Sequence, residues 1–175
     1  LPYQERVARW HDEIAVRWSA TIANADVTGP VALLVWGDPG LYDSTLRIAA
    51  RLSPAPQITV IPGITSLQTL TAAHATVLNE IGAPFIVTTG RRLRDEGWPE
   101  GVDTVAIMLD AGGAFDAIAP EGIHIWWGAY VGMKEQIIIE GPLADVADQI
   151  TKSPTHGNQA EKGDHGGQCG GKDRH

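Results

Sequence analysis

An apolar run that ends in a glycine- and proline-containing turn constrains the fold of this chain more than any other stretch. Residues 31–35 read Val-Ala-Leu-Leu-Val, and residues 37–40 read Gly-Asp-Pro-Gly. A continuous apolar run is typical of a strand that is buried on both faces, as in a parallel sheet. The strand must end at the turn, because Pro39 lacks a backbone donor and the glycines permit conformations closed to other residues. We predict a strand, a tight loop and a helix that begins near Leu41.

A second unit of the same kind follows. We predict a short strand at 58–61, a loop Pro-Gly-Ile-Thr-Ser at 62–66 and a helix at 67–78. Ligands of open α/β sheets bind outside the carboxyl ends of the strands, so the two loops are expected to share a cleft. There the Asp38 carboxylate can receive an amine or hydroxyl, and loop amides can receive a carboxylate. For Thr65 and Ser66, helix capping alone is an equally good interpretation.

Length, charge and cysteine content exclude several classes of protein. The 175 residues suit one domain or two small ones, and the formal net charge of -8 argues against nucleic acid as a partner. No apolar stretch approaches the ~18 residues of a membrane span, and the N-terminal residues do not resemble a secretory signal. Cys169 is the single cysteine, which excludes an internal disulfide and fits a reducing, cytoplasmic location. Neither the dinucleotide nor the P-loop glycine motif occurs.

The remaining pattern predicts an α/β chain with a break at Gly82-Ala83-Pro84. We expect residues 1–82 and 83–150 to form two α/β domains and residues 151–175 to be a disordered tail, because the tail has no Val, Ile, Leu or aromatic residue. Its His156, His165, Cys169 and His175 match no compact zinc pattern, so no metal site is expected. The other expected helices are 3–25, 114–119 and 143–150, and the other expected strands are 85–89, 104–109, 123–127 and 136–140.

A cluster of basic residues follows the predicted strand at 85–89. Arg91, Arg92 and Arg94 are the densest cations in an acidic chain. A solvated turn explains them as well as a functional role does. Because a guanidinium matches a carboxylate in bidentate fashion, Arg91 and Arg92 are our candidates for holding a polycarboxylate substrate.

With both loops in view, the chain resembles the tetrapyrrole methylases, S-adenosylmethionine-dependent enzymes that methylate corrin and sirohaem precursors. The residues that carry the resemblance are 36–42, Trp-Gly-Asp-Pro-Gly-Leu-Tyr, and 61–66, Ile-Pro-Gly-Ile-Thr-Ser. Five runs are similar to one branch of that family: 34–39, Leu-Val-Trp-Gly-Asp-Pro; 42–47, Tyr-Asp-Ser-Thr-Leu-Arg; 88–93, Thr-Thr-Gly-Arg-Arg-Leu; 108–110, Met-Leu-Asp; and 127–130, Trp-Gly-Ala-Tyr. The likeness covers roughly residues 1–150.

The resemblance implies a fold, a cofactor and a set of contacts. It implies two α/β domains with S-adenosyl-L-methionine in the cleft between them and a first domain that is incomplete here, because the family opens with a strand and a glycine-rich loop absent from this chain. A homodimer is also implied, although the sequence itself does not show one. The residues implied to contact the cofactor are Gly37 and Asp38 at its methionine end, Leu41 and Tyr42 beside them, Thr65 and Ser66 from the next loop, and Met108 and Ala129 near the adenine.

The branch that the chain resembles methylates precorrin-5 at ring carbon 1 and releases the extruded acetyl group as acetate. We therefore expect a methyltransferase of corrin biosynthesis with a tetrapyrrole substrate. The residue that assists acetyl loss is not identified; Tyr42, Asp43 and Tyr130 are candidates. The alternatives are another precorrin methyltransferase, a nucleotide-binding α/β protein that uses the same loop, and a non-catalytic fragment that pairs with another chain through an exposed sheet edge.

Overall fold

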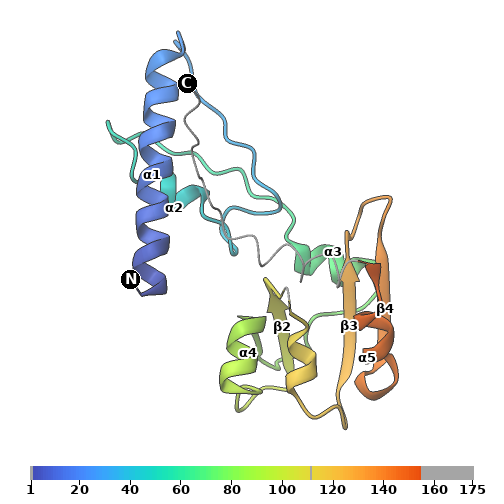
Figure 1. Ribbon diagram of the computed structural model, residues 1–175. Coiled ribbons are helices and arrows are strands. Elements are labelled where there is room, and N and C mark those ends of the chain that lie inside the picture. The colour runs from blue at the N-terminus through green and yellow to red at the C-terminus, as the bar shows by residue number, and fades with distance from the viewer. Residues whose placement is uncertain (1, 111, 155–175) are drawn as a thin grey trace, which may run out of the picture. The chain divides into compact units, whose positions relative to one another are not determined.

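A computed structural model describes residues 2–110 and 112–154 of the chain. The backbone contacts divide it into two compact units, Leu1–Thr65 and Ser66–His175, which are described separately (Figure 1). The domain boundary expected at residues 82/83 falls inside the second unit and stays a prediction. Residues 155–175, which hold most of the expected tail and all of its histidines and its cysteine, lie outside the described residues, whereas Thr151, the first residue of that tail, is helical.

The first unit is organised by a long helix. Helix α1 spans Tyr3–Asn24, as predicted, and packs against the short helix α2, Thr45–Ala49. His11 and Ala15 of α1 and Ile48 and Ala49 of α2 are buried. Trp10 is 51% exposed, because the buried face of α1 is centred on His11 and Ala15.

The strands predicted at 31–35 and 58–61 are wrong for this structure. Both segments lack a strand assignment, and neither belongs to a sheet among the described residues. Leu34 is 100% exposed and Ile61 is 84% exposed. An apolar run becomes a strand only when a neighbouring strand satisfies its amides and carbonyls, and the first unit supplies no such neighbour within the part described.

Helix α2 also begins later than predicted. Its first residue is Thr45 rather than one near Leu41. Tyr42 has a φ of 51°, in the left-handed region, which interrupts a right-handed helix at this position. The carboxylate of Asp43 then accepts a hydrogen bond from the Thr45 amide at 2.6 Å and satisfies a donor of the first turn.

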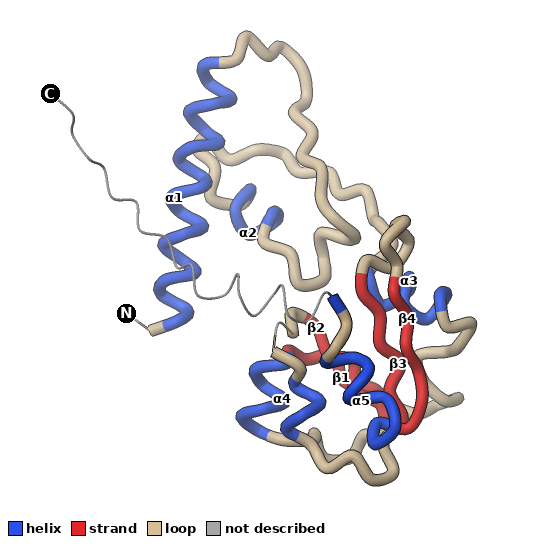
Figure 2. Tube along the Cα trace, turned by 45° about the vertical axis from the view of Figure 1, so that its right-hand side comes forward, coloured by secondary structure: helices blue, strands red, loops and turns tan. Residues whose placement is uncertain are grey.

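The second unit contains two small sheets (Figure 2). Strands β1, Phe85–Thr89, and β2, Thr104–Met108, are parallel, with Val87 opposite Ala106, and helix α4, Gly90–Glu96, connects them. The strands predicted at 85–89 and 104–109 are thus confirmed. Thr89 caps α4 by accepting the Arg92 amide at 3.3 Å.

Strands β3, His124–Ala129, and β4, Ile137–Pro142, form the second sheet and are antiparallel. They confirm the strands predicted at 123–127 and 136–140 with bounds shifted by one or two residues. Helix α5, Leu143–Thr151, confirms the predicted closing helix, and residues Ala114–Ala117 form a 3-10 turn, η1. The core of the unit is the cluster Phe115, Ile139, Leu143 and Ile150.

Helix α3, Ser66–Ala73, begins close to its predicted start but ends before Leu78. The next residue, His74, has a side chain that is only 2% exposed. Its Nδ1 lies 3.0 Å from a Glu140 carboxylate oxygen and its Nε2 lies 3.1 Å from the Trp127 carbonyl oxygen. This histidine therefore joins the end of α3 to both strands of the second sheet, in agreement with a structural interpretation of His74.

A search of the described helices for a long, apolar, membrane-spanning segment finds none.

The core cluster gives a direct test of this packing. Ile150 is fully buried, so Ile150→Ala should lower the free energy of unfolding of the second unit by about 2–5 kcal/mol. Asp148→Ala in the same helix removes only an exposed pair with Lys152 and should cost less than about 1 kcal/mol. Urea denaturation followed by tryptophan fluorescence measures both, since Trp127 packs against the cluster. Equal losses in the two variants would contradict the assigned core.

Candidate functional site

The two predicted loops of the first unit meet through one carboxylate. Asp38 Oδ1 accepts a hydrogen bond from the Gly40 amide at 2.7 Å, within its own loop. Asp38 Oδ2 accepts a hydrogen bond from the Gly63 amide at 2.8 Å, across to the second loop. Asp38 therefore stands beside the Pro62–Ser66 segment, as the shared-cleft prediction requires, even though neither loop is held by a sheet.

The backbones of the two loops are in direct contact. A Cβ atom added to Gly63 would lie 2.0 Å from the Gly37 carbonyl oxygen, so a side chain at residue 63 would force the loops apart. A Cβ atom added to Gly37 would lie 3.5 Å from the Ile64 carbonyl oxygen and 3.9 Å from Thr65 Cα. Gly37 also has a φ of +86°, a conformation that favours glycine. The structure thus brings Gly37, Asp38 and Thr65 together.

The contact keeps Asp38 ionised. The Gly63 and Gly40 amides lower the pKa of the Asp38 carboxyl below its ordinary value of 3.8. Each carboxylate oxygen has two lone pairs and uses one of them here, so the half-buried group can accept further donors. An ammonium group is the partner that such a carboxylate binds most strongly.

Leu41 and Tyr42 continue the same turn. The Leu41 amide donates to the Asp38 carbonyl at 3.3 Å, and the side chain of Tyr42 is exposed. Tyr42 is one of four non-glycine residues with a positive φ in the described chain, together with Ala75, Leu109 and Tyr130. Such residues are uncommon and are found preferentially at functional sites.

Three of the predicted cofactor residues belong to the second unit. Ser66 Oγ donates to Met108 Sδ at 3.6 Å, so the structure brings these two together. Ala129 ends β3 and pairs with Ile137. The residues after Met108 and Ala129, Leu109 and Tyr130, both adopt the left-handed conformation, so each of the two strands ends in a backbone turn of the same kind.

The three arginines have different surroundings. Arg94 forms an ion pair with Asp110 at 2.9 Å, and the same carboxylate accepts the Ala114 amide at 2.6 Å at the start of η1. Arg92 pairs with Glu96 of its own helix at 2.7 Å, and both side chains are more than half exposed. Arg91 is exposed on the first turn of α4. Arg94 therefore has a structural role, and the substrate role predicted for Arg91 and Arg92 stays a prediction.

A contact between a histidine and a serine was not anticipated. His11 Nε2 lies 3.0 Å from Ser44 Oγ, 33 residues along the chain. Burial lowers the pKa of His11, as do the positive charges of Arg51 and Arg47, while Asp12 raises it. The sequence predicted the helix 3–25 that holds His11 but gave no signal for this contact.

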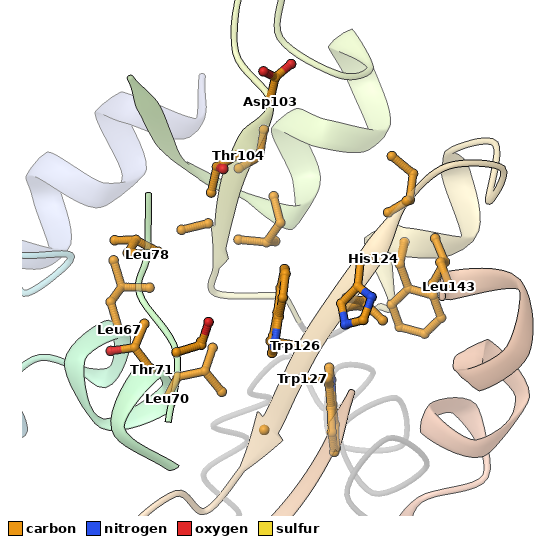
Figure 3. A pocket seen from close by; sticks show the side chains of 18 of the residues that line it. Leu67, Leu70, Thr71, Leu78, Asp103, Thr104, His124, Trp126, Trp127 and Leu143 are labelled. Atoms are coloured by element: carbon orange, nitrogen blue, oxygen red, sulfur yellow. The ribbon is translucent and has the colours of Figure 1, made fainter. Parts of the chain in front are cut away.

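The second unit also contains a cavity that the sequence did not indicate. Its volume is about 490 Å³, and its walls come from α3, β2 and β3 (Figure 3). Leu67, Leu70, Thr104 and Trp126 are among the residues that line it. β2 pairs only with β1 and β3 only with β4 in the described residues, so this apolar space occupies a position between the two sheets. Among the residues that the structure describes, no three His, Cys, Asp or Glu side chains are placed to hold a metal ion.

Two glycine-containing loops that follow apolar segments and are joined by an aspartate are features of an α/β ligand-binding protein. The profile of the tetrapyrrole (corrin/porphyrin) methylases matches residues 2–147, and the chain belongs to this family. The predicted family and its α/β fold are thus confirmed.

The chain is similar to one curated protein and to one solved structure. It is 43% identical over 158 residues to the precorrin-6A synthase [deacetylating] of a Sinorhizobium species, an alignment that covers 87% of this chain and 60% of the relative. It is also similar to the crystal structure of a putative cobalamin synthesis related protein (CobF) from Corynebacterium diphtheriae, with a TM-score of 0.73 and 38% identity over 93% of this chain and 68% of that one. The chain thus spans about three fifths of the length of the curated relative.

The loop contact predicts the effect of a single methyl group. Gly63→Ala should separate the two loops, because its Cβ would otherwise lie 2.0 Å from the Gly37 carbonyl oxygen. Hydrogen exchange by mass spectrometry should show faster exchange in the peptides that contain residues 38–41 and 61–65. Gly29→Ala is the matched control, since its Cβ would meet no atom within 4 Å. Unchanged exchange in Gly63→Ala would contradict the contact.

The same contact should depend on pH in one direction. The pKa of Asp38 in the folded protein is lower than its ordinary value of 3.8. The contact is therefore fully formed above pH 3.8 and is lost as the pH falls through the lowered pKa. In an NMR titration the amide proton resonances of Gly40 and Gly63 should move together below pH 3.8. Asp38→Asn should abolish this transition, since the amide does not titrate. A transition that survives in Asp38→Asn would assign it to another group.

Proposed function

We propose that the protein is an S-adenosylmethionine-dependent methyltransferase of corrin biosynthesis that methylates precorrin-5 at ring carbon 1, with loss of acetate, to give precorrin-6A. Family membership and 43% identity to a deacetylating precorrin-6A synthase support this proposal. The observation that carries it in the structure is the Asp38 bridge between the two loops.

The residues of the first unit fit the polar end of the cofactor. S-adenosylmethionine carries an ammonium, a carboxylate and a methyl sulfonium that supplies the transferred carbon. We assign the ammonium to the ionised Asp38 carboxylate, which retains unused lone pairs. Gly37, Leu41, Tyr42 and Thr65 lie along the same two loops, whose backbones approach so closely that residue 63 has no room for a side chain.

In the second unit we assign Ser66, Met108 and Ala129 to the adenosine part. The Ser66–Met108 contact joins a hydroxyl to a polarisable thioether, a pair that suits one polar and one apolar edge of a nucleoside. The strand ends Met108 and Ala129 are each followed by a left-handed residue.

Methyl transfer to an electron-rich macrocycle requires positioning more than acid–base chemistry. The role of the protein is to hold the acceptor carbon in line with the donor and to exclude water. Precorrins carry many carboxylates, and Arg91 and Arg92 at the start of α4 are our candidates for binding them. Arg92 would exchange its exposed Glu96 partner for a substrate carboxylate, at little cost because exposed pairs contribute only about 0–1 kcal/mol.

One observation favours a second candidate function. In this alternative the chain binds another chain and does not catalyse the reaction by itself. Leu34, Trp36 and Ile61 are 100%, 89% and 84% exposed in extended segments that pair with no strand in the described residues. Apolar segments of this kind are sites of association with another chain.

Calorimetric titration with S-adenosylhomocysteine tests the cofactor site. Asp38→Ala should weaken binding by about 10-fold or more, because a hydrogen bond to a charged group contributes about 1.5–3 kcal/mol. Asp26→Ala removes an exposed carboxylate of the same unit and should leave the affinity unchanged. No binding of S-adenosylhomocysteine at millimolar concentration would contradict the proposal. Binding of ATP without binding of S-adenosylhomocysteine would contradict it too and would favour a nucleotide-binding protein.

The arginines require a separate test with a stable polycarboxylate, and uroporphyrin is suitable. Arg91→Gln and Arg92→Gln should each weaken uroporphyrin binding several-fold at low salt, and the difference should shrink as salt screens the charges. Lys134→Gln in an exposed loop of the same unit is the charge-matched control. Equal weakening by Lys134→Gln would show that only the net charge matters.

A further inference from the structure

The contact between Ser44 and His11 has the geometry of a nucleophile beside a base. Ser44 Oγ lies 3.0 Å from His11 Nε2, within the hydrogen-bonding range of such pairs. The ring of His11 is buried, with 3% of the residue exposed, while Ser44 is only partly buried. A base behind an accessible hydroxyl is the arrangement that an activated serine requires.

Ser44 does not use its hydroxyl as serines in its position normally do. It is the N-cap residue of α2, yet its side chain makes no capping hydrogen bond. The preceding residue, Asp43, takes over that function by accepting the Thr45 amide at 2.6 Å. Ser44 could cap its own helix, yet its hydroxyl contacts the buried His11 instead. A functional role of the contact with His11 explains this choice of partner.

The charges around His11 favour a ring that can accept a proton. The groups that act on it are Asp12 from α1 and Arg47 and Arg51 from α2 and the residues after it. Arg51 also pairs with Asp12 at 2.9 Å, which offsets the effect of that carboxylate. Burial and the two guanidinium groups therefore lower the pKa of His11 and keep its imidazole neutral at pH 7.

We propose that Ser44 and His11 form an acyl-transfer pair that takes up an acetyl group, with Ser44 Oγ as nucleophile and His11 Nε2 as base. Oγ attacks the acetyl carbonyl carbon and gives its proton to Nε2. The bond from that carbon to the leaving group breaks, and the electron pair stays with the leaving group. His11 then loses this proton to solvent and is a base again. Water attacks the carbonyl carbon of acetyl-Ser44 and gives a proton to His11 Nε2. The bond from that carbon to Oγ breaks, His11 passes the proton to Oγ, and acetate and one proton are released.

The source of the acetyl group rests on the proposed function. Ser44 lies two residues after Tyr42, in the turn that we assign to the cofactor pocket. The curated relative of this chain is named as a deacetylating enzyme. If the leaving group is ring carbon 1 of precorrin-5, the electron pair that remains on it is the nucleophile that methylation needs. Acetyl loss and methyl transfer would then be two halves of one reaction, without any oxidant or reductant.

The test uses p-nitrophenyl acetate, so it does not depend on the corrin substrate. The 175-residue protein should release a burst of about one equivalent of p-nitrophenolate and gain one acetyl group, located on Ser44 by peptide mass spectrometry. Ser44→Ala should lose the burst, and His11→Gln should slow it by about 10²-fold or more. Ser44→Cys should retain it. Ser19→Ala, in the same helix as His11, is the control and should match the parent protein.

A pH profile separates catalysis from a purely structural contact. The acetylation rate should rise with pH as His11 loses its proton, and Arg51→Gln should move that rise to higher pH because a neighbouring positive charge is removed. Acetylation elsewhere than on Ser44, a burst that survives Ser44→Ala, or a pH profile unmoved by Arg51→Gln would overturn the proposal. Titration with S-adenosylhomocysteine on the same samples reports the proposed function independently, so either can fail alone.

Discussion

The Asp38 carboxylate is the interaction on which the arrangement of the first unit depends. It accepts one amide from its own loop and one from the loop 25 residues later. Charge-assisted hydrogen bonds of this kind are about twice as strong as neutral ones. They act here without a sheet beneath them, because neither apolar segment that leads into the loops has a strand partner in the described residues. One ionised side chain thus performs the positioning that neighbouring strands provide in a complete α/β sheet.

This arrangement has a consequence for the proposed methyl transfer. Transfer of a methyl group from a sulfonium depends on exact placement and on a dry site more than on acids and bases. The loop contact can provide placement, since the Gly37 carbonyl group leaves no room for a side chain at residue 63. Exclusion of water requires cover over the exposed Leu34, Trp36 and Ile61, and the described residues of the first unit do not provide that cover.

The second unit shows how far local patterns determine a fold. Strand β1 has its predicted bounds, and β2, β3, β4 and α5 differ from prediction by one or two residues. These elements are short, and each strand has its partner close in the sequence. Capping residues also acted locally: Thr89 and Asp110 satisfy amides at the starts of α4 and η1. Where a signal and its partner lie within some 20 residues of each other, the sequence suffices.

The sequence by itself determined the family, the strands and the closing helix of the second unit, and the position of the two loops, because motifs, periodicity and turn residues are local properties. Only the tertiary structure decided that residues 31–35 and 58–61 remain outside any described sheet, since a strand depends on a partner that no local pattern specifies. It also decided which atoms meet over long separations. Asp38 with Gly63, His74 with Glu140 and His11 with Ser44 are contacts between residues 25 to 66 positions apart, and packing alone brings them within hydrogen-bonding distance.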